Sequence, residues 1–470
     1  MTPLDQPPLQ DGLLVSWYGD DFTGSAAVME AMTFAGLPSV LFLDVPDAQM
    51  LARFTGYRGI GVAGVARSRS PEWMGRELPR VFDCLALLGA PISHYKVCST
   101  LDSAPHVGSI GVAADLAIPV LGGKWHPLVL AAPAIGRYQA FGNLFAVAAG
   151  GIARLDRHPT MSRHPITPMS EADVRVHLGR QTDRCIGLVD LLALADAGSA
   201  QSALRDELTA GAEIVALDVV DDADLAAIGR LIWTNRGERL LAIGSQGLEY
   251  ALIAHWMEAG VLARTPNAAN AGAGAVEHVV VVSGSCSSDT ASQIRWAKDH
   301  GFRPIRAQVS LAADERAWQR EIERLGHEAL LAIGAGCDPI VFTAAGPDDP
   351  AIGAFKSAIA TSGASEADVH ERVGSGLGRL LGTTLSEAKL KRGIIAGGDT
   401  SGYGVTELRI DALTALAPTV PGAALLKAHA RDPVVEGMEI ALKGGQMGTI
   451  DYFQWIKEGG GASRERSGTR

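Results

Sequence analysis

Three glycine-rich turns in the second half of the chain carry groups that suit the binding of a phosphate. They begin at Ser283 (SGSCS), Gly397 (GGDT) and Lys443 (KGGQMG), and each follows an apolar stretch that predicts a β-strand. Glycines let the backbone approach a phosphate closely, and the amides that open a following helix attract an anion. Lys443 could add a point charge, and the carboxylate of Asp399 could hold Mg²⁺ through water.

Each of these turns taken alone is more often ordinary turn chemistry than a ligand site. Three of them at the carboxyl ends of predicted strands of one domain favour a ligand site, because open α/β sheets bind their ligands at that edge. Neither GxxxxGK[ST] nor GxGxxG occurs in the chain, so neither a P-loop nor a dinucleotide-binding fingerprint is present.

Two adjacent acids in the first half, Asp20 and Asp21, follow the apolar stretch LLVSWYG and precede a predicted helix. Carboxylates in this position suit hydroxyl recognition or general-base catalysis on an alcohol. The alternative is that Asp21 or Thr23 only caps the following helix. With two acids side by side, one could cap the helix while the other faces the ligand.

Two further segments of the first half carry anion-binding side chains. At the end of a predicted strand, Lys96 is followed by Ser99 and Thr100, which could bind a carboxylate or sugar hydroxyls, although a solvated loop is an equal alternative. The loop 154–169 is basic and proline-containing, and it could act as an anion clamp. Its candidate residues are Arg157, His158 and Arg163. Its two histidines lack the further ligands that a zinc site needs, and Cys98 is expected to be a buried, inert thiol.

Short apolar runs alternate with longer helical patterns along the whole chain, which predicts α/β architecture with mostly parallel or mixed sheets. The pattern stops in the small, polar stretch around residues 263–277 and then restarts, so we predict two domains. The predicted boundaries are 12–264 for the first domain, 265–276 for the linker, 277–456 for the second domain and 457–470 for a disordered tail.

Composition narrows the class of protein further. The chain has 470 residues and a net charge of −11 without a long basic run, so nucleic acid is not an expected partner. Five scattered cysteines without a CxxC pair argue against a disulfide framework. The N-terminus lacks the pattern of a signal peptide, and no apolar stretch predicts a membrane span, so we expect a cytoplasmic protein without a membrane partner.

Taken together and in this order, the motifs DDFTG from Asp20, SGSCS, GGDT and KGGQMG resemble the four-carbon acid sugar kinase family over roughly residues 13–453. The resemblance implies an N-terminal substrate domain, a C-terminal nucleotide domain, and ATP-dependent phosphorylation of a terminal hydroxyl on acids such as tetronates or oxo-tetronates. Carried onto this chain, it implies ATP contacts from Ser285, Ser287, Gly397, Gly398, Asp399, Thr400 and Gly445, and we add Lys443 and Gly444 of the third turn as nucleotide-binding candidates. It implies sugar-acid contacts from Asp20, Asp21, Lys96, Ser99, Thr100 and Arg137, and we add Thr23 as a substrate-binding candidate.

The lysine segment departs from the family pattern as we read it. Family members commonly read KxDSTxRG, whereas Cys98 stands here in place of the family aspartate and Asp102 in place of its arginine. One anion-binding positive charge is then missing, and the basic loop is expected to compensate for it. The sequence therefore supports a kinase more strongly than it supports a four-carbon substrate.

The expected mechanism has the three glycine-rich turns cradling ATP and Mg²⁺ while Asp20 or Asp21 deprotonates the acceptor hydroxyl, with a slight preference for Asp21. Closure of the two domains about the linker would exclude water. One alternative is a sugar-acid or nucleotide sensor without turnover. Another, disfavoured by the missing glycine fingerprint, is an NAD(P)-dependent oxidoreductase. A homodimer is possible on base rates.

Overall fold

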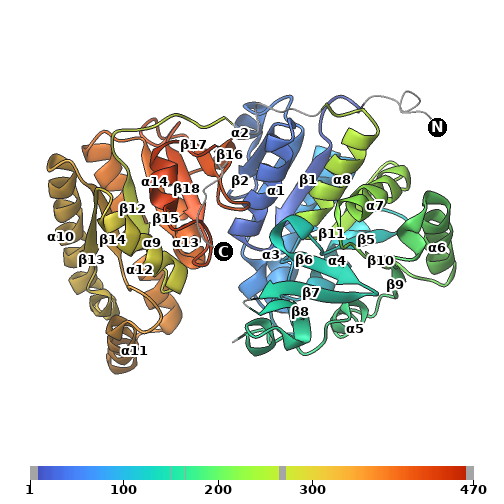
Figure 1. Cartoon of the computed structure of the whole chain (residues 1–470), viewed down its shortest axis with the longest axis horizontal. Helices are drawn as coiled ribbons and strands as arrows, with labels where there is room; N and C mark the ends of the chain where they lie inside the picture. Colours follow the sequence, from blue (N-terminus) through green and yellow to red (C-terminus); the bar gives the residue numbers. More distant parts are fainter. Residues whose placement is uncertain (1–8, 149, 165, 264–270, 462–470) are drawn as a thin grey trace. The chain divides into compact units, whose positions relative to one another are not determined.

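A computed structural model describes residues 9–148, 150–164, 166–263 and 271–461. The chain divides between Thr265 and Pro266 into two compact units, and each of them is an α/β domain built around its own sheet (Figure 1). The prediction of two α/β domains with mostly parallel sheets is therefore confirmed. Within the described residues, no helix combines the length and the apolar character needed to cross a membrane.

The N-terminal unit contains an all-parallel sheet of eight strands in the order β2-β3-β1-β4-β11-β5-β10-β9. Its strands are nearly all apolar, which fits a sheet covered on both faces. They are β1 (Val15–Gly19), β2 (Ser39–Phe42), β3 (Gly59–Ala63), β4 (Ile92–Lys96), β5 (His126–Val129), β9 (Ile186–Val189), β10 (Ile214–Leu217) and β11 (Leu240–Gly244).

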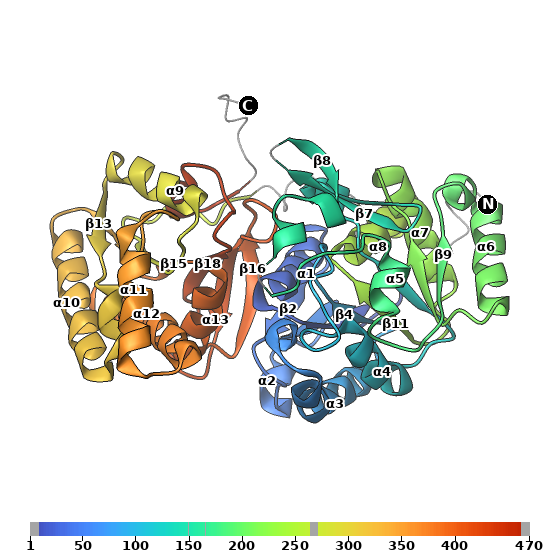
Figure 2. The same cartoon turned by 90° about the horizontal axis from the view of Figure 1, so that it is seen from below.

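Helices cover both faces of this sheet, with α1, α7 and α8 on one face and α3 and α4 on the other (Figure 2). Side-chain caps fix several helix starts: Asp21 caps α1, Ser70 caps α3 and Ser109 caps α4. The helices are α1 (Phe22–Phe34), α2 (Ala48–Ala52), α3 (Pro71–Leu88), α4 (Ile110–Leu121), α5 (Val174–Leu178), α6 (Ala197–Thr209), α7 (Asp222–Thr234) and α8 (Gly247–Glu258).

A small antiparallel sheet, β6 (Arg137–Ala140), β7 (Asn143–Ala148) and β8 (Gly151–Arg154), is attached at the carboxyl edge of the main sheet. The buried carboxylate of Asp218, just after β10, holds it there. Asp218 accepts hydrogen bonds from the backbone N–H groups of Phe141 and Gly142 (3.0 Å for Gly142) and from the side chain of Gln139 (3.1 Å). Burial raises the pKa of Asp218, and these donors oppose the rise.

The C-terminal unit has a mixed sheet in the order β13-β14-β12-β15-β18-β17-β16. The first five strands are parallel to one another, whereas β17 runs antiparallel to both of its neighbours, β18 and β16. The strands are β12 (Val280–Ser283), β13 (Phe302–Arg306), β14 (Asp338–Phe342), β15 (Arg392–Ala396), β16 (Ala412–Ala417), β17 (Leu425–His429) and β18 (Glu439–Lys443).

In this unit α10, α12 and α13 cover one face of the sheet, while α9 covers the other (Figure 2), where α14 packs against α9 and β15. The helices are α9 (Ser288–Lys298), α10 (Glu315–Gly334), α11 (Pro350–Ser362), α12 (Glu366–Glu387), α13 (Gly398–Glu407) and α14 (Tyr452–Lys457). Most begin at a side-chain cap, such as Ser287 for α9 and Ser365 for α12, whereas α13 begins at Gly397 without one.

Both units place their first strand at the same topological position. In the order β2-β3-β1-β4, the chain leaves β1 toward one side of the sheet and later returns to add β4 on the other side. The order β13-β14-β12-β15 repeats this arrangement around β12. Ligands bind outside the carboxyl ends of the strands at such a switch point. The turns after β1 and β12 are therefore the expected binding positions of the two units.

The described part of the predicted linker pairs with the chain that follows α14. The N–H of Ala273 donates to the carbonyl of Gly459 (2.7 Å), and the N–H of Val276 donates to that of Lys457 (3.0 Å). The N–H of Gly461 donates to Pro418 (2.8 Å). The tail predicted to be disordered from residue 457 is thus ordered as far as 461. Residues 264–270 and 462–470 lie outside the described residues.

Candidate active site

The acidic pair follows β1 at the switch point of the N-terminal unit, and its two members have different surroundings. Asp20 is 1% exposed, and both of its carboxylate oxygens accept hydrogen bonds from Arg67, at 3.2 and 2.6 Å. Asp21 is 28% exposed; its Oδ1 accepts from the N–H of Gly24 (3.1 Å) and from Nη2 of Arg67 (2.6 Å). Asp21 therefore caps α1 and also forms an ion pair.

Burial raises the pKa of Asp20 above its ordinary value, and Asp21 adds to this rise. The positive charges of Arg67 and Lys96 oppose it. Burial disfavours the charge of Arg67 as well, but Asp20 and Asp21 outweigh that effect and hold its pKa well above the ordinary value. The buried acid and its guanidinium partner thus depend on one another.

Sequence reasoning missed Arg67, although the structure places it at the centre of this group. It lies in the 3₁₀ turn η1 (Ala66–Ser68), a few residues after β3, and its N–H donates to the carbonyl of Asp20 (3.0 Å). The detectable signal was a basic residue shortly after an apolar strand, in GIGVAGVAR. The turn after β3 therefore places a positive charge beside the two acids.

Lys96 ends β4 directly beside the acidic turn, since Gly19 pairs with Lys96 in the sheet. Its Nζ is buried and donates to the carbonyl of Val97 (2.7 Å). A Cβ placed on Gly24 would lie 2.6 Å from Nζ of Lys96 and 2.4 Å from Oδ1 of Asp21, so both groups border this glycine. The structure thus brings together the lysine and the acidic pair, and their role in substrate binding stays a prediction.

In the loop after Lys96, the hydroxyl of Thr100 donates to Asp102 (3.0 Å) and lies 2.8 Å from the sulfur of Cys98. Ser99 is half-buried next to it. Burial, with help from Asp102, raises the pKa of the Cys98 thiol to about 11, so it stays protonated and unreactive at neutral pH. This agrees with the expectation of an inert thiol.

The remaining predicted sugar-acid residues of the N-terminal unit are less clearly placed for binding. Nη1 of Arg137 donates to the carbonyls of Ile135 and Gly136, both at 3.1 Å, and its Nε is buried without a partner among the described residues. Thr23 lies half-buried in the first turn of α1. Arg157 and Arg163 are exposed. These four assignments stay predictions.

His158 has a structural role in the basic loop. It is 9% exposed; its Nε2 lies 3.3 Å from the carbonyl of Val147, and its Nδ1 accepts from the N–H groups of Thr160 (3.2 Å) and Met161 (3.3 Å). Both ring nitrogens are occupied in holding the loop, so these contacts do not support the predicted role in substrate binding. Over the described residues, no cluster of three metal-ligating side chains occurs.

In the C-terminal unit, the three glycine-rich turns follow three neighbouring parallel strands. Ser283 of β12 pairs with Ala396 of β15, which pairs in turn with Lys443 of β18. Past the strand ends, Gly284 donates to the carbonyl of Ala396 (3.0 Å), and Gly397 donates to that of Lys443 (2.9 Å). The predicted clustering of the turns at one edge of the sheet is what the structure shows.

Serine and threonine hydroxyls join these turns to one another. Ser287 caps α9 by accepting from the N–H of Thr290 (3.1 Å), and its hydroxyl also donates to the carbonyl of Gly445. Thr290 donates to the same carbonyl (2.9 Å). A Cβ on Gly445 would lie 2.7 Å from Oγ of Ser285. The first and third turns are therefore in close contact, and glycine is needed for their approach.

The second turn leads into α13, whose first amides face the same edge of the sheet without a side-chain cap. Gly397 adopts φ +122°, a conformation that other residues rarely take, and a Cβ on Gly284 would lie 2.1 Å from Oγ1 of Thr400. An uncapped helix start of this kind offers amide donors and a positive dipole end to an anion. The side chain of Asp399 lies outside the described residues.

Lys443 is a buried lysine without a carboxylate partner among the described residues. It is 1% exposed, and its Nζ donates to Oγ1 of Thr290 and to the carbonyl of Gly444, both at 3.0 Å. Burial lowers its pKa to about 8, and Asp289 is the group that opposes this shift. A buried cation with no carboxylate in hydrogen-bond contact, as far as the described side chains extend, favours an anionic ligand beside the three glycine-rich turns.

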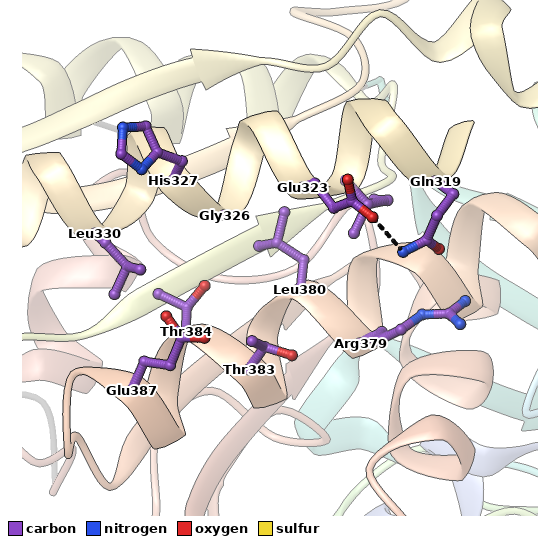
Figure 3. A pocket seen from close by; sticks show the side chains of 11 residues that line it. Gln319, Glu323, Gly326, His327, Leu330, Arg379, Leu380, Thr383, Thr384 and Glu387 are labelled. Carbon is purple, nitrogen blue, oxygen red and sulfur yellow. Dashed lines mark hydrogen bonds between the residues drawn. The ribbon is translucent and has the colours of Figure 1, made fainter. Parts of the chain in front are cut away.

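A separate hollow of about 350 Å³ lies between α10 and α12 of the same unit (Figure 3). Its walls include Gln319, Glu323 and His327 from α10, with Arg379 and Glu387 from α12. None of the predicted nucleotide or sugar-acid residues lines it, so it is distinct from the glycine-rich turns.

Known proteins share both units of this chain. Residues 15–252 match the model of a sugar-binding N-terminal domain, and residues 280–453 match that of a nucleotide-binding C-terminal domain. A 3-oxo-isoapionate kinase of Paraburkholderia graminis is 48% identical over 448 residues, which is 95% of each chain. A 3-oxo-tetronate kinase of Methylobacterium radiotolerans is 29% identical over 94% of this chain and 98% of its own.

Solved structures share the fold as well. A Haemophilus influenzae protein matches with a TM-score of 0.72 at 24% identity, over 94% of this chain and 99% of its own. A Salmonella typhimurium protein matches with a TM-score of 0.77 at 22% identity, over 94% and 98%. With a sugar-binding unit that carries the acidic turn and a nucleotide-binding unit that carries the glycine cradle, the chain belongs to the four-carbon acid sugar kinase family of ATP-dependent sugar-acid kinases.

Proposed function

We propose that this kinase transfers the γ-phosphoryl group of ATP to a hydroxyl of an oxo sugar acid of the 3-oxo-isoapionate type. The relative that carries this name is 48% identical to the chain, whereas the 3-oxo-tetronate kinase of Methylobacterium radiotolerans is 29% identical. Both relatives are named for 3-oxo acids, so an oxo acid is the substrate class that they share. A four-carbon oxo acid is accordingly the second acceptor to test.

The observation that carries the nucleotide half of the proposal is the buried ammonium of Lys443, which ends the strand before the third glycine-rich turn and has no carboxylate partner among the described residues. We propose that it neutralises phosphate charge together with the first amides of α13. Ser287 and Thr290 would keep the first and third turns together around the phosphates. Phosphoryl transfer relies on such positioning and charge neutralisation rather than on covalent chemistry by the protein.

Mg²⁺ is proposed as the partner of the nucleotide. Mg²⁺ sites in phosphotransferases usually combine one or two carboxylates with the phosphates of the substrate, so a cluster of protein ligands is not required. Asp399 stays the predicted carboxylate for this ion. When bound, the ion would neutralise charge that develops on the transferred group.

For the acceptor half, the geometry favours Asp21 over Asp20 as the general base. Both oxygens of Asp20 are held by Arg67, and the side chain is buried. Asp21 uses only Oδ1, which leaves Oδ2 without a hydrogen-bond partner among the described residues on a carboxylate that is partly exposed. Asp21 would take the proton of the acceptor hydroxyl while the hydroxyl oxygen forms its bond to the γ-phosphorus and the bond from that phosphorus to ADP breaks.

The test is ADP release by the purified protein with ATP and Mg²⁺. The acceptors are 3-oxo-isoapionate, a 3-oxo-tetronate, and the corresponding tetronates without the oxo group. We expect the highest kcat/KM with the first acid and the lowest with the acids that lack the oxo group. Absence of turnover with every acid would refute the proposal. Higher turnover of the tetronates than of both oxo acids would refute the assignment of the substrate class.

A further inference from the structure

One guanidinium group holds both carboxylates of the acidic turn. Nη2 of Arg67 lies 2.6 Å from Oδ1 of Asp20 and 2.6 Å from Oδ1 of Asp21, while its Nε lies 3.2 Å from Oδ2 of Asp20. A planar fork is suited to such a bridge, since its donors are fixed relative to one another. The bridge fixes three of the four carboxylate oxygens and leaves Oδ2 of Asp21 without a partner among the described residues.

Arg67 is itself fixed by its surroundings. Its N–H donates to the carbonyl of Asp20 (3.0 Å), and a Cβ on Gly108 would lie 2.4 Å from its carbonyl oxygen. Gly108 has φ +59° and belongs to the loop that follows Lys96, and its N–H donates to the carbonyl of Arg69 (2.9 Å). The turns after β1, β3 and β4 thus pack together and fix the backbone of the turn that carries Arg67.

We propose that Arg67 is a positioning residue for phosphoryl transfer: it pairs with both oxygens of Asp20 and holds Oδ1 of Asp21, so that Oδ2 of Asp21 is presented to the acceptor hydroxyl. This inference rests on the proposed function, in which Asp21 is the base. Arg67 acts through the two aspartates, so its removal changes the turnover step more than the binding of ATP.

Loss of the guanidinium has a defined chemical consequence. The charged and titratable groups that influence Asp20 are Asp21, Arg67, Lys96, Tyr18 and Tyr95, and Cys98 faces Arg67. Burial already raises the pKa of Asp20, and Arg67 is the strongest opposing charge. Without Arg67, Asp20 takes up a proton at a higher pH and can donate it in a hydrogen bond to Asp21. This hydrogen bond then competes with the substrate hydroxyl for the carboxylate of Asp21.

The experiment compares pH profiles of kcat and kcat/KM for the wild type, R67Q, R67K and the control R69Q. Arg69 is exposed and contacts the Trp73 ring rather than a carboxylate, so R69Q makes the same charge change two residues away. We expect R67Q to lose about 100-fold in kcat, with an acid limb displaced to higher pH and an unchanged KM for ATP. R67K keeps the charge but not the fork, so it should lose about tenfold with the acid limb in place. R69Q should match the wild type.

The double variant D20N/R67Q distinguishes two roles of Arg67: positioning of Asp21, and compensation of the buried charge of Asp20. It removes the buried charge together with its partner, so it should fold even if R67Q does not. If Arg67 only compensated Asp20, the double variant would recover wild-type kcat, and the proposal would fall. We expect kcat to stay at least about tenfold below the wild type, because Asp21 still lacks its second anchor.

A readout without turnover distinguishes failure of this inference from failure of the proposed function. The titration of the Asp20 carboxyl can be followed by ¹³C NMR with aspartate labelling, and D20N and D21N serve to assign the signals. In R67Q this titration should move to higher pH. That shift is expected whichever acid is the substrate. An unmoved titration, or an unmoved acid limb in an active R67Q, would overturn the proposal even where the wild type is an active kinase.

Discussion

Replacement of Lys443 by methionine tests whether the buried ammonium exists to meet phosphate. The side chain is 1% exposed, and burial lowers its pKa from an ordinary 10.5 to about 8. At about 1.4 kcal/mol per pH unit, this difference corresponds to about 3 kcal/mol of cost for keeping the charge in the folded protein without a nucleotide. Phosphate charge beside the ammonium should offset that cost, so the binding of ATP and the protonation of Lys443 are linked.

The sign of the linkage follows from the two states. Below pH 8 the lysine is charged in the folded and the unfolded chain, so the full cost is present. Between pH 8 and 10.5 the unfolded chain binds more protons, and the ATP-free protein gains stability as the pH rises. At pH 9 only about a tenth of the ATP-free molecules carry the proton on Lys443, against about nine-tenths at pH 7.

Calorimetric titration with MgATP measures the consequence directly. We expect binding to the wild type to be about tenfold weaker at pH 9 than at pH 7, with uptake of about one proton at pH 9. K443M should bind weakly at both values and lose the pH dependence. K298M, which alters an exposed lysine in the last turn of α9, is the control and should follow the wild type. Equal wild-type affinity at both values, or an unchanged pH dependence in K443M, would refute the reasoning.

Three other substitutions address the remaining parts of the two units. D21N should lower kcat by at least about 100-fold while ATP affinity measured by calorimetry is kept, and full turnover would exclude Asp21 as the base. G284A places a Cβ 2.1 Å from Oγ1 of Thr400, so it should weaken ATP binding at least about tenfold. The control G402A, whose Cβ meets nothing within 4 Å, should bind ATP like the wild type. Equal ATP affinities of the two variants would contradict the proposal that the glycine-rich turns hold ATP. H94L removes the fully buried partner of Glu249 (2.7 Å). It should destabilise the N-terminal unit by about 1–3 kcal/mol in urea unfolding, because a buried polar group loses its hydrogen bond, and an unchanged stability would contradict this reasoning.

Much of the fold follows from local patterns. Apolar runs ending in glycine or in a polar pair predicted the strands β1, β4, β12, β15 and β18, and the structure has each of them. The switch-point position of β1 and β12 did not follow from the sequence, because strand order depends on contacts between segments far apart in the chain. For the same reason, no local signal indicated that residues 457–461 would pair with residues 273–276.

In the candidate site, too, some residues were predictable from local sequence and others depended on tertiary contacts. The glycine-rich turns and the acidic pair are contiguous in sequence, and both were found there. Arg67 was not, since a basic residue shortly after a strand is too common a pattern to single it out, and only the neighbouring strands β1, β3 and β4 bring it to the acids. His158 was selected for its residue type, but its burial and its backbone contacts give it a structural role.

The sequence by itself determined the class of this protein: two α/β domains, glycine turns suited to phosphate and an acidic turn suited to an alcohol. These features reside in short contiguous segments, whose backbone preferences and side-chain chemistry can be read locally. The tertiary structure decided which carboxylate oxygen of the acidic pair lacks a partner among the described residues, which lysine is buried without a described carboxylate beside it, and which arginine bridges the two acids. Burial and charge pairing are properties of packing between distant segments, and they set the protonation and the orientation of the groups at both sites.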